Sequence, residues 1–429
     1  MSRSGSSFDT EYDGPVIGKK MSSTFVTTCK QSTATIHLRP NMIFDTFYTL
    51  NTEKHVSAGI VFLSFFLLSI LVRALRPKPS KGTRENTKVS HEQDPLGFDS
   101  IIPTKGLPTS HQPDWPRYWK PGKFQMTMAQ RKLDINNWFN YDHLFDKEHA
   151  SKIAMARASD SENYVDYLDG IDEAVLELLE IIVTYVVKRY PDMFRTDGEY
   201  IYMDHLSEKY RIQAPYDLHP LAVCGLLVMD DLYVLKKGAN DIFTLRGAFL
   251  ACPTGWRLQQ RIGWPLHQIH DPVPQWKERL RKSMERFFLN LRPSKAIQRN
   301  NLFIQPVGEL FHIFPFDENP KCTSVDQVHI RTELQSLTRL PRSQANVFTV
   351  RTYLVPLSDL RHEPEQLEIL WDHVRNFPPD IAEYKCRHLW VDVFEQFCRE
   401  VLGRNDPYIA GHAEEKTTSN SQGKCPAGF

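Results

Sequence analysis

The sequence predicts an α+β protein in which helices flank a mainly antiparallel sheet, preceded by a single transmembrane helix. A change in the spacing of apolar residues along the chain indicates which segments form the sheet and which form the helices. Apolar residues recur at helical spacing up to about residue 237 and again after about residue 362, whereas the segments between them alternate as strands do. An uncharged apolar run over residues 56–72 indicates the membrane helix.

The N-terminal region is expected to contain a disordered segment, a membrane anchor and a linker. Residues 1–54 are rich in Ser and Thr and show little periodicity. Residues 55–75 are assigned to the transmembrane helix, because an apolar helix of about 17 to 25 residues spans a bilayer. A buried helix of a soluble protein is the alternative, but no polar stripe interrupts the run. Residues 76–122 are rich in Pro, Ser and charge, which is typical of a flexible linker.

The charges around the apolar run predict its orientation. Lys and Arg are more frequent directly after the run than directly before it. By the positive-inside rule, the protein is a single-pass membrane protein whose C-terminal domain faces the cytosol, and the endoplasmic reticulum is one candidate membrane.

Residues 123–403 are expected to form the functional domain, and residues 404–429 a polar, disordered tail. The apolar pattern predicts helices at residues 133–158, 171–189, 222–237, 363–377 and 380–402. Alternating patterns predict strands at residues 241–252, 301–306, 309–316 and 346–357.

Composition argues against several classes of protein. The 429 residues contain 52 Lys and Arg and 52 Asp and Glu, so no overall charge would attract nucleic acid. The seven cysteines form no CxxC or CxxH motif, which argues against a zinc site, an iron–sulfur site and a disulfide framework. This cysteine usage fits a reducing compartment.

Residues 249–276 contain the densest group of candidate functional side chains, namely Trp256, Trp264, His267 and His270. Prolines flank the two histidines. Because proline fixes φ and restrains the residue before it, this segment can present an imidazole at a fixed angle. The alternative is that these Trp and Pro residues pack against the end of a sheet.

Two later segments carry polar groups where a sheet is usually apolar. In residues 328–341, an extended chain places Arg331, Glu333 and Gln335 on one face, whereas a helix would bring Arg331 and Gln335 together. In residues 346–357, Arg351 and Tyr353 share a face that could line a polar pocket or hold a carboxylate. An ion network without chemistry and a solvated strand face remain the alternatives.

Three segments in this order resemble the haem-dependent oxidative N-demethylase family: PTGWRLQQRIGWPLHQIHDPVPQW, HIRTELQSLTRLP and NVFTVRTYLVPL. QRKLDINNW, KRYPDMF and LVMDDLYVL extend the resemblance over roughly residues 126–402. Fungal members are known as HRQ-type proteins, a name that matches His329, Arg331 and Gln335.

The resemblance implies a PAS-like fold that binds b-type haem through a histidine. Characterised bacterial relatives demethylate a secondary amine with O2 and take electrons from separate flavin and iron–sulfur subunits. His270 is the expected iron ligand, because a neutral imidazole on a rigid loop suits haem iron. The other residues expected to contact haem are Trp256, Trp264, His267, Arg351 and Tyr353.

Proton supply to O2 is expected from Glu333 together with Arg331 and Arg351, and Arg351 could instead bind a haem propionate. The sequence has no GxGxxG motif, so a separate flavin or iron–sulfur donor is expected. The predicted protein is thus a membrane-anchored haem monooxygenase that N-demethylates a small amine.

Three other functions are the alternatives to this prediction. A membrane-tethered haem sensor or non-catalytic module would share the haem site. A non-haem iron oxygenase could use His267, His270 and Asp271, although three ligands in one short turn converge poorly. A thiolate-ligated enzyme of the cytochrome P450 kind is discounted, because the residues around Cys398 lack the expected glycine and arginine. We expect Cys398 to be a buried helix residue.

Overall fold

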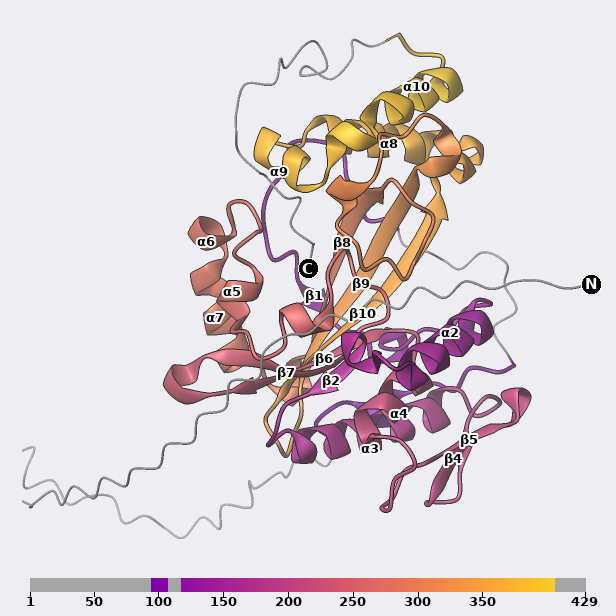
Figure 1. The fold of residues 1–429 in the computed structure, drawn as a ribbon, viewed down its shortest axis with the longest axis vertical. Coiled ribbons are helices and arrows are strands. Elements are labelled where there is room, and N and C mark those ends of the chain that lie inside the picture. Colours follow the sequence, from indigo (N-terminus) through magenta and orange to yellow (C-terminus); the bar gives the residue numbers. More distant parts are fainter. Residues whose placement is uncertain (1–93, 107–116, 406–429) are drawn as a thin grey trace, which may run out of the picture. The chain divides into compact units, whose positions relative to one another are not determined.

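The computed structural model of the protein describes residues 94–106 and 117–405 (Figure 1). All of them belong to one compact unit, Lys88–Phe429. The predicted disordered segment over residues 1–54, the transmembrane helix over 55–75 and most of the tail over 404–429 lie outside the described residues, as does part of the linker.

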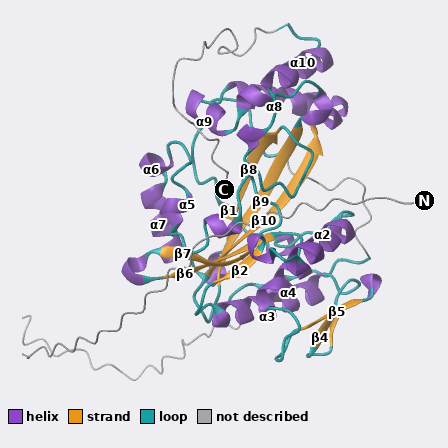
Figure 2. Ribbon diagram, in the orientation of Figure 1, coloured by secondary structure: helices purple, strands orange, loops and turns teal. Residues whose placement is uncertain are grey.

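A seven-stranded antiparallel sheet forms the centre of this unit, with strand order β1-β8-β9-β10-β6-β7-β2 (Figure 2). Its strands are β1 (Arg131–Lys132), β2 (Val165–Tyr167), β6 (Asp231–Lys237), β7 (Phe243–Phe249), β8 (Ile297–Gln305), β9 (His329–Arg339) and β10 (Asn346–Pro356). A smaller sheet contains β3 (Arg195–Thr196), β4 (Tyr200–Met203) and β5 (Glu208–Arg211).

The longest hairpin, β9–β10, fixes the orientation of the polar residues. Its register runs without a bulge from Asn346 opposite Arg339 to Pro356 opposite His329. Because side chains alternate between the faces of a strand, Arg331, Glu333 and Gln335 lie on one face.

Helices cover both faces of the sheet. On one face lie α5 (Leu266–Ile269), α6 (Trp276–Arg279) and α7 (Arg281–Asn290), whose apolar side chains pack on Tyr233, Leu337 and Val350. On the other face lie α3 (Asp172–Arg189) and α4 (Pro220–Leu227), next to α2 (Phe145–Arg157). The same face is covered further along β8 and β9 by α8 (Pro364–Arg375), α9 (Pro379–Tyr384) and α10 (Val391–Leu402).

Short 3-10 helices connect these elements. They are η1 (Phe98–Ser100), η2 (Ile135–Asn137), η3 (Ser161–Asn163), η4 (Asp204–Leu206), η5 (Ala239–Asp241), η6 (Leu258–Gln260), η7 (Pro293–Lys295), η8 (Phe316–Glu318), η9 (Val325–Gln327), η10 (Leu357–His362) and η11 (Arg387–Leu389).

The α+β class with an antiparallel sheet is confirmed, but the predicted fold class needs one correction. No helix within residues 94–106 and 117–405 is long and apolar enough to cross a bilayer. The described residues thus support the α+β part of the predicted fold class and do not support its transmembrane helix.

Four predicted elements also need correction. The helix at 222–237 is α4 followed by strand β6, and the strand at 309–316 is a loop with one isolated bridge, between His312 and Thr254. The helix at 133–158 begins at Phe145, because the Asp142 carboxylate accepts a hydrogen bond from the Leu144 N–H (2.8 Å) just before it. The helix at 380–402 is split into α9 and α10.

Candidate functional site

His270 is held in a fixed orientation at the end of α5. Pro265 precedes the first turn of that helix, and His270 follows its last residue. The His270 Nδ1 lies 2.8 Å from the carbonyl oxygen of Leu266. A carbonyl only accepts hydrogen bonds, so Nδ1 carries the proton and Nε2 carries the lone pair. Trp276 stacks on the imidazole at 5.0 Å between ring centroids, which fixes the plane of the ring.

The imidazole of His270 lines a largely apolar cavity between α5, α7 and the sheet. Burial lowers the pKa of His270 to about 4, against the opposing effect of its hydrogen bond to Leu266. The ring is therefore neutral at physiological pH. The cavity is lined by Met128, Gln130, Tyr233, Leu235, Leu245, Leu266, Ile269, His270, Met284, Phe287, Phe288, Ile297, Arg299, Gln335, Leu337 and Phe348.

The enclosed space of this cavity is narrow, about 50 Å³. Sites for ligands of drug size or larger enclose several hundred cubic ångströms, so a larger ligand requires lining side chains to move. Met128 and Met284 are the most adaptable types among them, because their unbranched side chains repack readily.

A second, polar cavity adjoins the first, since Tyr233, Gln335 and Phe348 line both. The remaining residues of its lining are Asp231, Cys252, Thr254, Trp256, Arg331, Glu333 and Val350. The structure thus brings His270, Trp256 and the polar row of β9 to one face of the sheet.

Glu333 is the most constrained carboxylate of the second cavity. Its Oε1 accepts from Arg331 Nε at 2.9 Å, and its Oε2 accepts from Gln335 (2.9 Å) and Asn301 (3.1 Å). Burial opposes ionisation, but the charge of Arg331 and these hydrogen bonds outweigh it, so the pKa of Glu333 is lowered. Glu333 is therefore an ionised acceptor.

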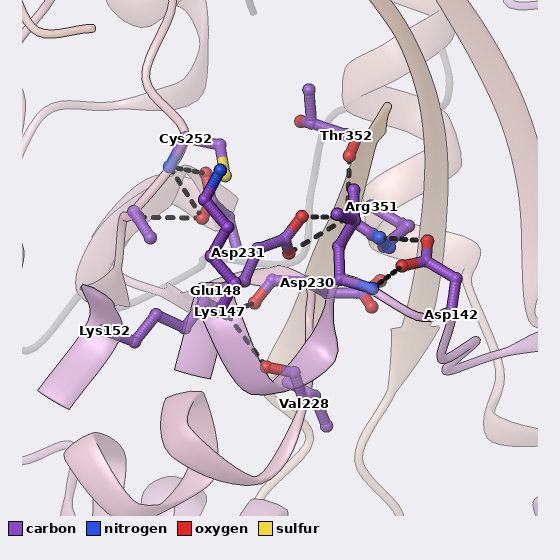
Figure 3. A network of polar contacts seen from close by, with 12 residues as sticks. Asp142, Lys147, Glu148, Lys152, Val228, Asp230, Asp231, Cys252, Arg351 and Thr352 are labelled. Carbon is purple, nitrogen blue, oxygen red and sulfur yellow. Dashed lines mark hydrogen bonds and ion pairs between the residues drawn. The ribbon is translucent and has the colours of Figure 1, made fainter. Parts of the chain in front are cut away.

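The first residue of β6 shapes the loop that carries Trp256. The Asp231 carboxylate accepts from the backbone N–H groups of Ala251 (2.8 Å) and Cys252 (3.1 Å), just after β7 ends (Figure 3). These bonds fix the direction in which the chain leaves the sheet. Trp256 follows, packed near Tyr233 and beneath the guanidinium of Arg261.

Arg351 points to the opposite face of the sheet. Its Nη2 lies 2.6 Å from the Asp142 carboxylate and its Nη1 3.3 Å from Glu148 (Figure 3). Both carboxylates and Arg351 are buried, and Arg351 also lies 4.7 Å from the ring of Tyr353. Arg351 and Tyr353 therefore line a separate groove, which they share with Asp142 and Glu148.

The other predicted site residues lie less centrally. Trp264 is 37% exposed at the surface. His267 precedes His270 by less than one helical turn and is not among the residues that line the His270 cavity. His329 lies at the start of β9, with Nδ1 3.4 Å from the carbonyl oxygen of Gln327.

Three residues of the two cavities escaped the sequence prediction: Tyr233, Asp231 and Arg299. The first two belong to an apolar segment that was interpreted as a helix, which concealed their alternation. Arg299 lies opposite Gln335 in the β8–β9 register, but the predicted strand began two residues later, at 301. A longer alternation over residues 297–305 was the signal available in the sequence.

A family model for the haem-dependent oxidative N-demethylase, alpha subunit-like, matches residues 129–394. The chain belongs to that family. The match contains every predicted site residue of this haem-dependent oxidative N-demethylase-like chain and every residue lining the two cavities except Met128, which agrees with the resemblance of its segments.

The residues present fit the group that the family name implies. A neutral imidazole with its proton on Nδ1 suits haem iron, and the apolar lining suits a porphyrin. Two buried guanidinium atoms have no hydrogen-bond partner within residues 94–106 and 117–405: Nε of Arg299 and Nη1 of Arg331. Such donors suit the acid groups of haem.

The alternatives of iron without haem and of thiolate ligation find no support in the described residues. Within them, no group of three or more His, Cys, Asp and Glu side chains could hold a metal ion. Cys398 is a buried residue of α10, as expected, and burial raises the pKa of its thiol well above the usual value.

Proposed function

We propose that this chain binds b-type haem through His270 and demethylates a small amine with O2 and electrons from a separate protein. One observation carries the proposal: an apolar cavity with a neutral histidine adjoins a polar cavity with an ionised carboxylate. The first arrangement suits a metalloporphyrin. The ionised carboxylate of the second would attract a cationic substrate, which requires the lining of that narrow space, about 10 Å³, to move.

His270 would hold the iron through Nε2, because Nδ1 donates to the carbonyl oxygen of Leu266. This hydrogen bond and the stacked Trp276 keep the imidazole in one orientation, which strengthens a metal ligand. When bound, haem supplies the binding and activation of O2, a chemistry that amino-acid side chains lack.

Glu333 would bind the protonated amine. Its carboxylate is ionised and held by Arg331 and Gln335, so it offers a fixed negative charge at the wall shared with the His270 cavity. A lowered pKa makes Glu333 a poor proton donor. We therefore assign it to binding the protonated amine through its charge, and not to the proton supply first expected of it.

The overall reaction inserts one atom of O2 into a C–H bond next to the amine nitrogen. The resulting carbinolamine breaks its C–N bond and releases formaldehyde and the demethylated amine. The second oxygen atom leaves as water, which consumes two electrons from the donor and two protons from solvent. The sequence contains no GxGxxG motif and no cysteine cluster, so we assign the electrons to a separate flavin or iron–sulfur protein.

The test is to load the full chain with haem and titrate it with dimethylamine while recording the Soret band. We expect a Soret shift, and release of formaldehyde once O2 and an electron donor are added. Glu333→Gln should keep the Soret band but weaken amine binding by about ten- to a hundredfold, because it removes a charged hydrogen-bond acceptor. Glu309→Gln, an exposed carboxylate, is the matched control.

Uptake of haem without any Soret shift or formaldehyde for a series of small methylated amines would identify a non-catalytic haem-binding module instead. Absence of a Soret band after haem addition would contradict the cofactor itself.

A further inference from the structure

Three basic side chains lie within electrostatic reach of one carboxylate at the wall between the two cavities. Arg299, Arg331 and Lys385 all interact electrostatically with one carboxylate, Glu333. Buried charges are normally paired, because desolvating an unpaired charge is costly. A buried cation of this wall that has no ion-pair partner would therefore favour a further anion.

Arg299 is the clearest case. It lines the same cavity as His270 and lowers the pKa of that histidine through its charge. Within the described part of the chain it forms no ion pair, and its buried Nε has no hydrogen-bond partner. Burial lowers the pKa of the Arg299 guanidinium, and the charge of Glu333 opposes this only in part.

Arg331 has one further donor to offer. It is 1% exposed, and it uses Nε for Glu333 and Nη2 for the Cys252 carbonyl (2.5 Å) and Thr352 hydroxyl (3.2 Å). Its buried Nη1 has no hydrogen-bond partner among the described residues. The guanidinium is thus fixed in place with one donor atom unused.

Lys385, at the end of α9, is the third basic residue that interacts with Glu333. Its Nζ donates to the Leu302 carbonyl at 2.6 Å and lies 3.8 Å from the ring of Phe303. Burial lowers the pKa of Lys385 to about 7, with Glu333 and Arg299 acting on it in opposite directions. The lysine is therefore partly charged at neutral pH and would gain charge beside an anion.

We propose that Arg299 forms a carboxylate-binding subsite at the wall of the His270 cavity, with Arg331 offering a further donor in the adjoining cavity. This inference rests on the proposed haem function of the same cavity. The carboxylate belongs either to a propionate of the haem or to an acidic group of the substrate. Arg351, the residue first expected to bind a propionate, is already paired with Asp142 and Glu148 on the opposite face.

The first experiment compares haem with its dimethyl ester, in which both propionates are neutral, by titrating each into the full chain at the Soret band. We expect the unmodified chain to bind haem about ten- to a hundredfold more tightly than the ester. Arg299→Met should remove most of that preference by weakening haem alone, and Arg299→Lys should restore part of it.

Arg281→Met is the matched control. It removes one positive charge from the nearby α7, where Arg281 pairs only with its neighbour Glu285 among the described residues. This variant should keep the full preference for haem over the ester, because Arg281 is not among the residues that line the cavity.

The second experiment titrates the haem-loaded chain with N-methylglycine and with dimethylamine. If haem and its ester bind equally, but Arg299→Met weakens N-methylglycine and not dimethylamine, the subsite takes the carboxylate of the substrate. Arg299→Met could change neither the preference for haem over its dimethyl ester nor the binding of N-methylglycine relative to dimethylamine. In that case the inference is wrong while haem binding stands. If neither haem nor the ester binds, the failure lies with the proposed cofactor.

Discussion

Asp230 is a buried acid whose surroundings favour its neutral form. Burial raises its pKa to about 7, against the opposing charges of Arg351 and Lys152, and the neighbouring Asp231 raises it further. Its Oδ2 has no hydrogen-bond partner among the described residues. Sequence reasoning did not find this group, because a pair of aspartates was placed within a predicted helix.

The folded chain therefore binds a proton at Asp230 more tightly than the unfolded chain, in which the pKa is near 3.8. Its stabilising effect is present below pH 3.8 and is lost as pH rises through about 7. We expect the contribution of Asp230 to the free energy of unfolding to fall between about pH 4 and pH 7, by up to about 1.4 kcal/mol per pH unit, and to level off above about pH 7.

Urea denaturation at a series of pH values measures this dependence. Asp230→Asn should flatten it above about pH 6, where Asp231, with a pKa raised to about 6, contributes less. Asp217→Asn, at an exposed aspartate, should leave it unchanged. The same slope in wild type and Asp230→Asn would exclude Asp230 as its source.

Helix α4 packs so closely against strand β7 that there is no room for a side chain at Gly225. A Cβ added at Gly225 in α4 would lie 2.0 Å from the ring of Phe249, the last residue of β7. Glycine is therefore required there by contact, although its backbone is helical.

Gly225→Ala should lower the free energy of unfolding by about 1–3 kcal/mol or more, because the added methyl forces helix and strand apart. Gly238→Ala is the control: its Cβ would meet nothing nearer than 3.6 Å, so we expect a change within about 0.5 kcal/mol. Chemical denaturation measures both. Equal effects of the two substitutions would show that the α4–β7 contact is looser than described.

Helices and strands were predicted correctly where the apolar residues follow one spacing. They were predicted wrongly where the apolar residues fit both a helix and a strand. The helix at 171–189 and the strand at 346–357 were predicted to within one residue at each end. Strand β6 is buried on both faces from Asp231 to Leu235, so its apolar residues do not alternate and it was taken for a helix. The break between α9 and α10 occurs at Cys386, whose positive φ of 48° has no signature in the sequence.

In the whole domain, the sheet separates two sets of polar residues that the sequence suggested might act together. Alternation along β9 correctly placed Arg331, Glu333 and Gln335 on one face. It could not show which strand faces would meet His270, because that depends on how α5–α7 pack across residues distant in sequence. The structure places Arg351 and Tyr353 on the other face, and Arg299 beside His270.

The central claim is that His270 holds haem in the cavity between α5–α7 and the sheet. The most direct measurement is the Soret absorption of the full chain after haem loading and gel filtration, for wild type, His270→Ala and His267→Ala. We predict retention of haem by wild type and His267→Ala, loss by His270→Ala, and recovery of the band in His270→Ala when free imidazole is added. Retention of haem by His270→Ala with an unchanged Soret band would contradict the account.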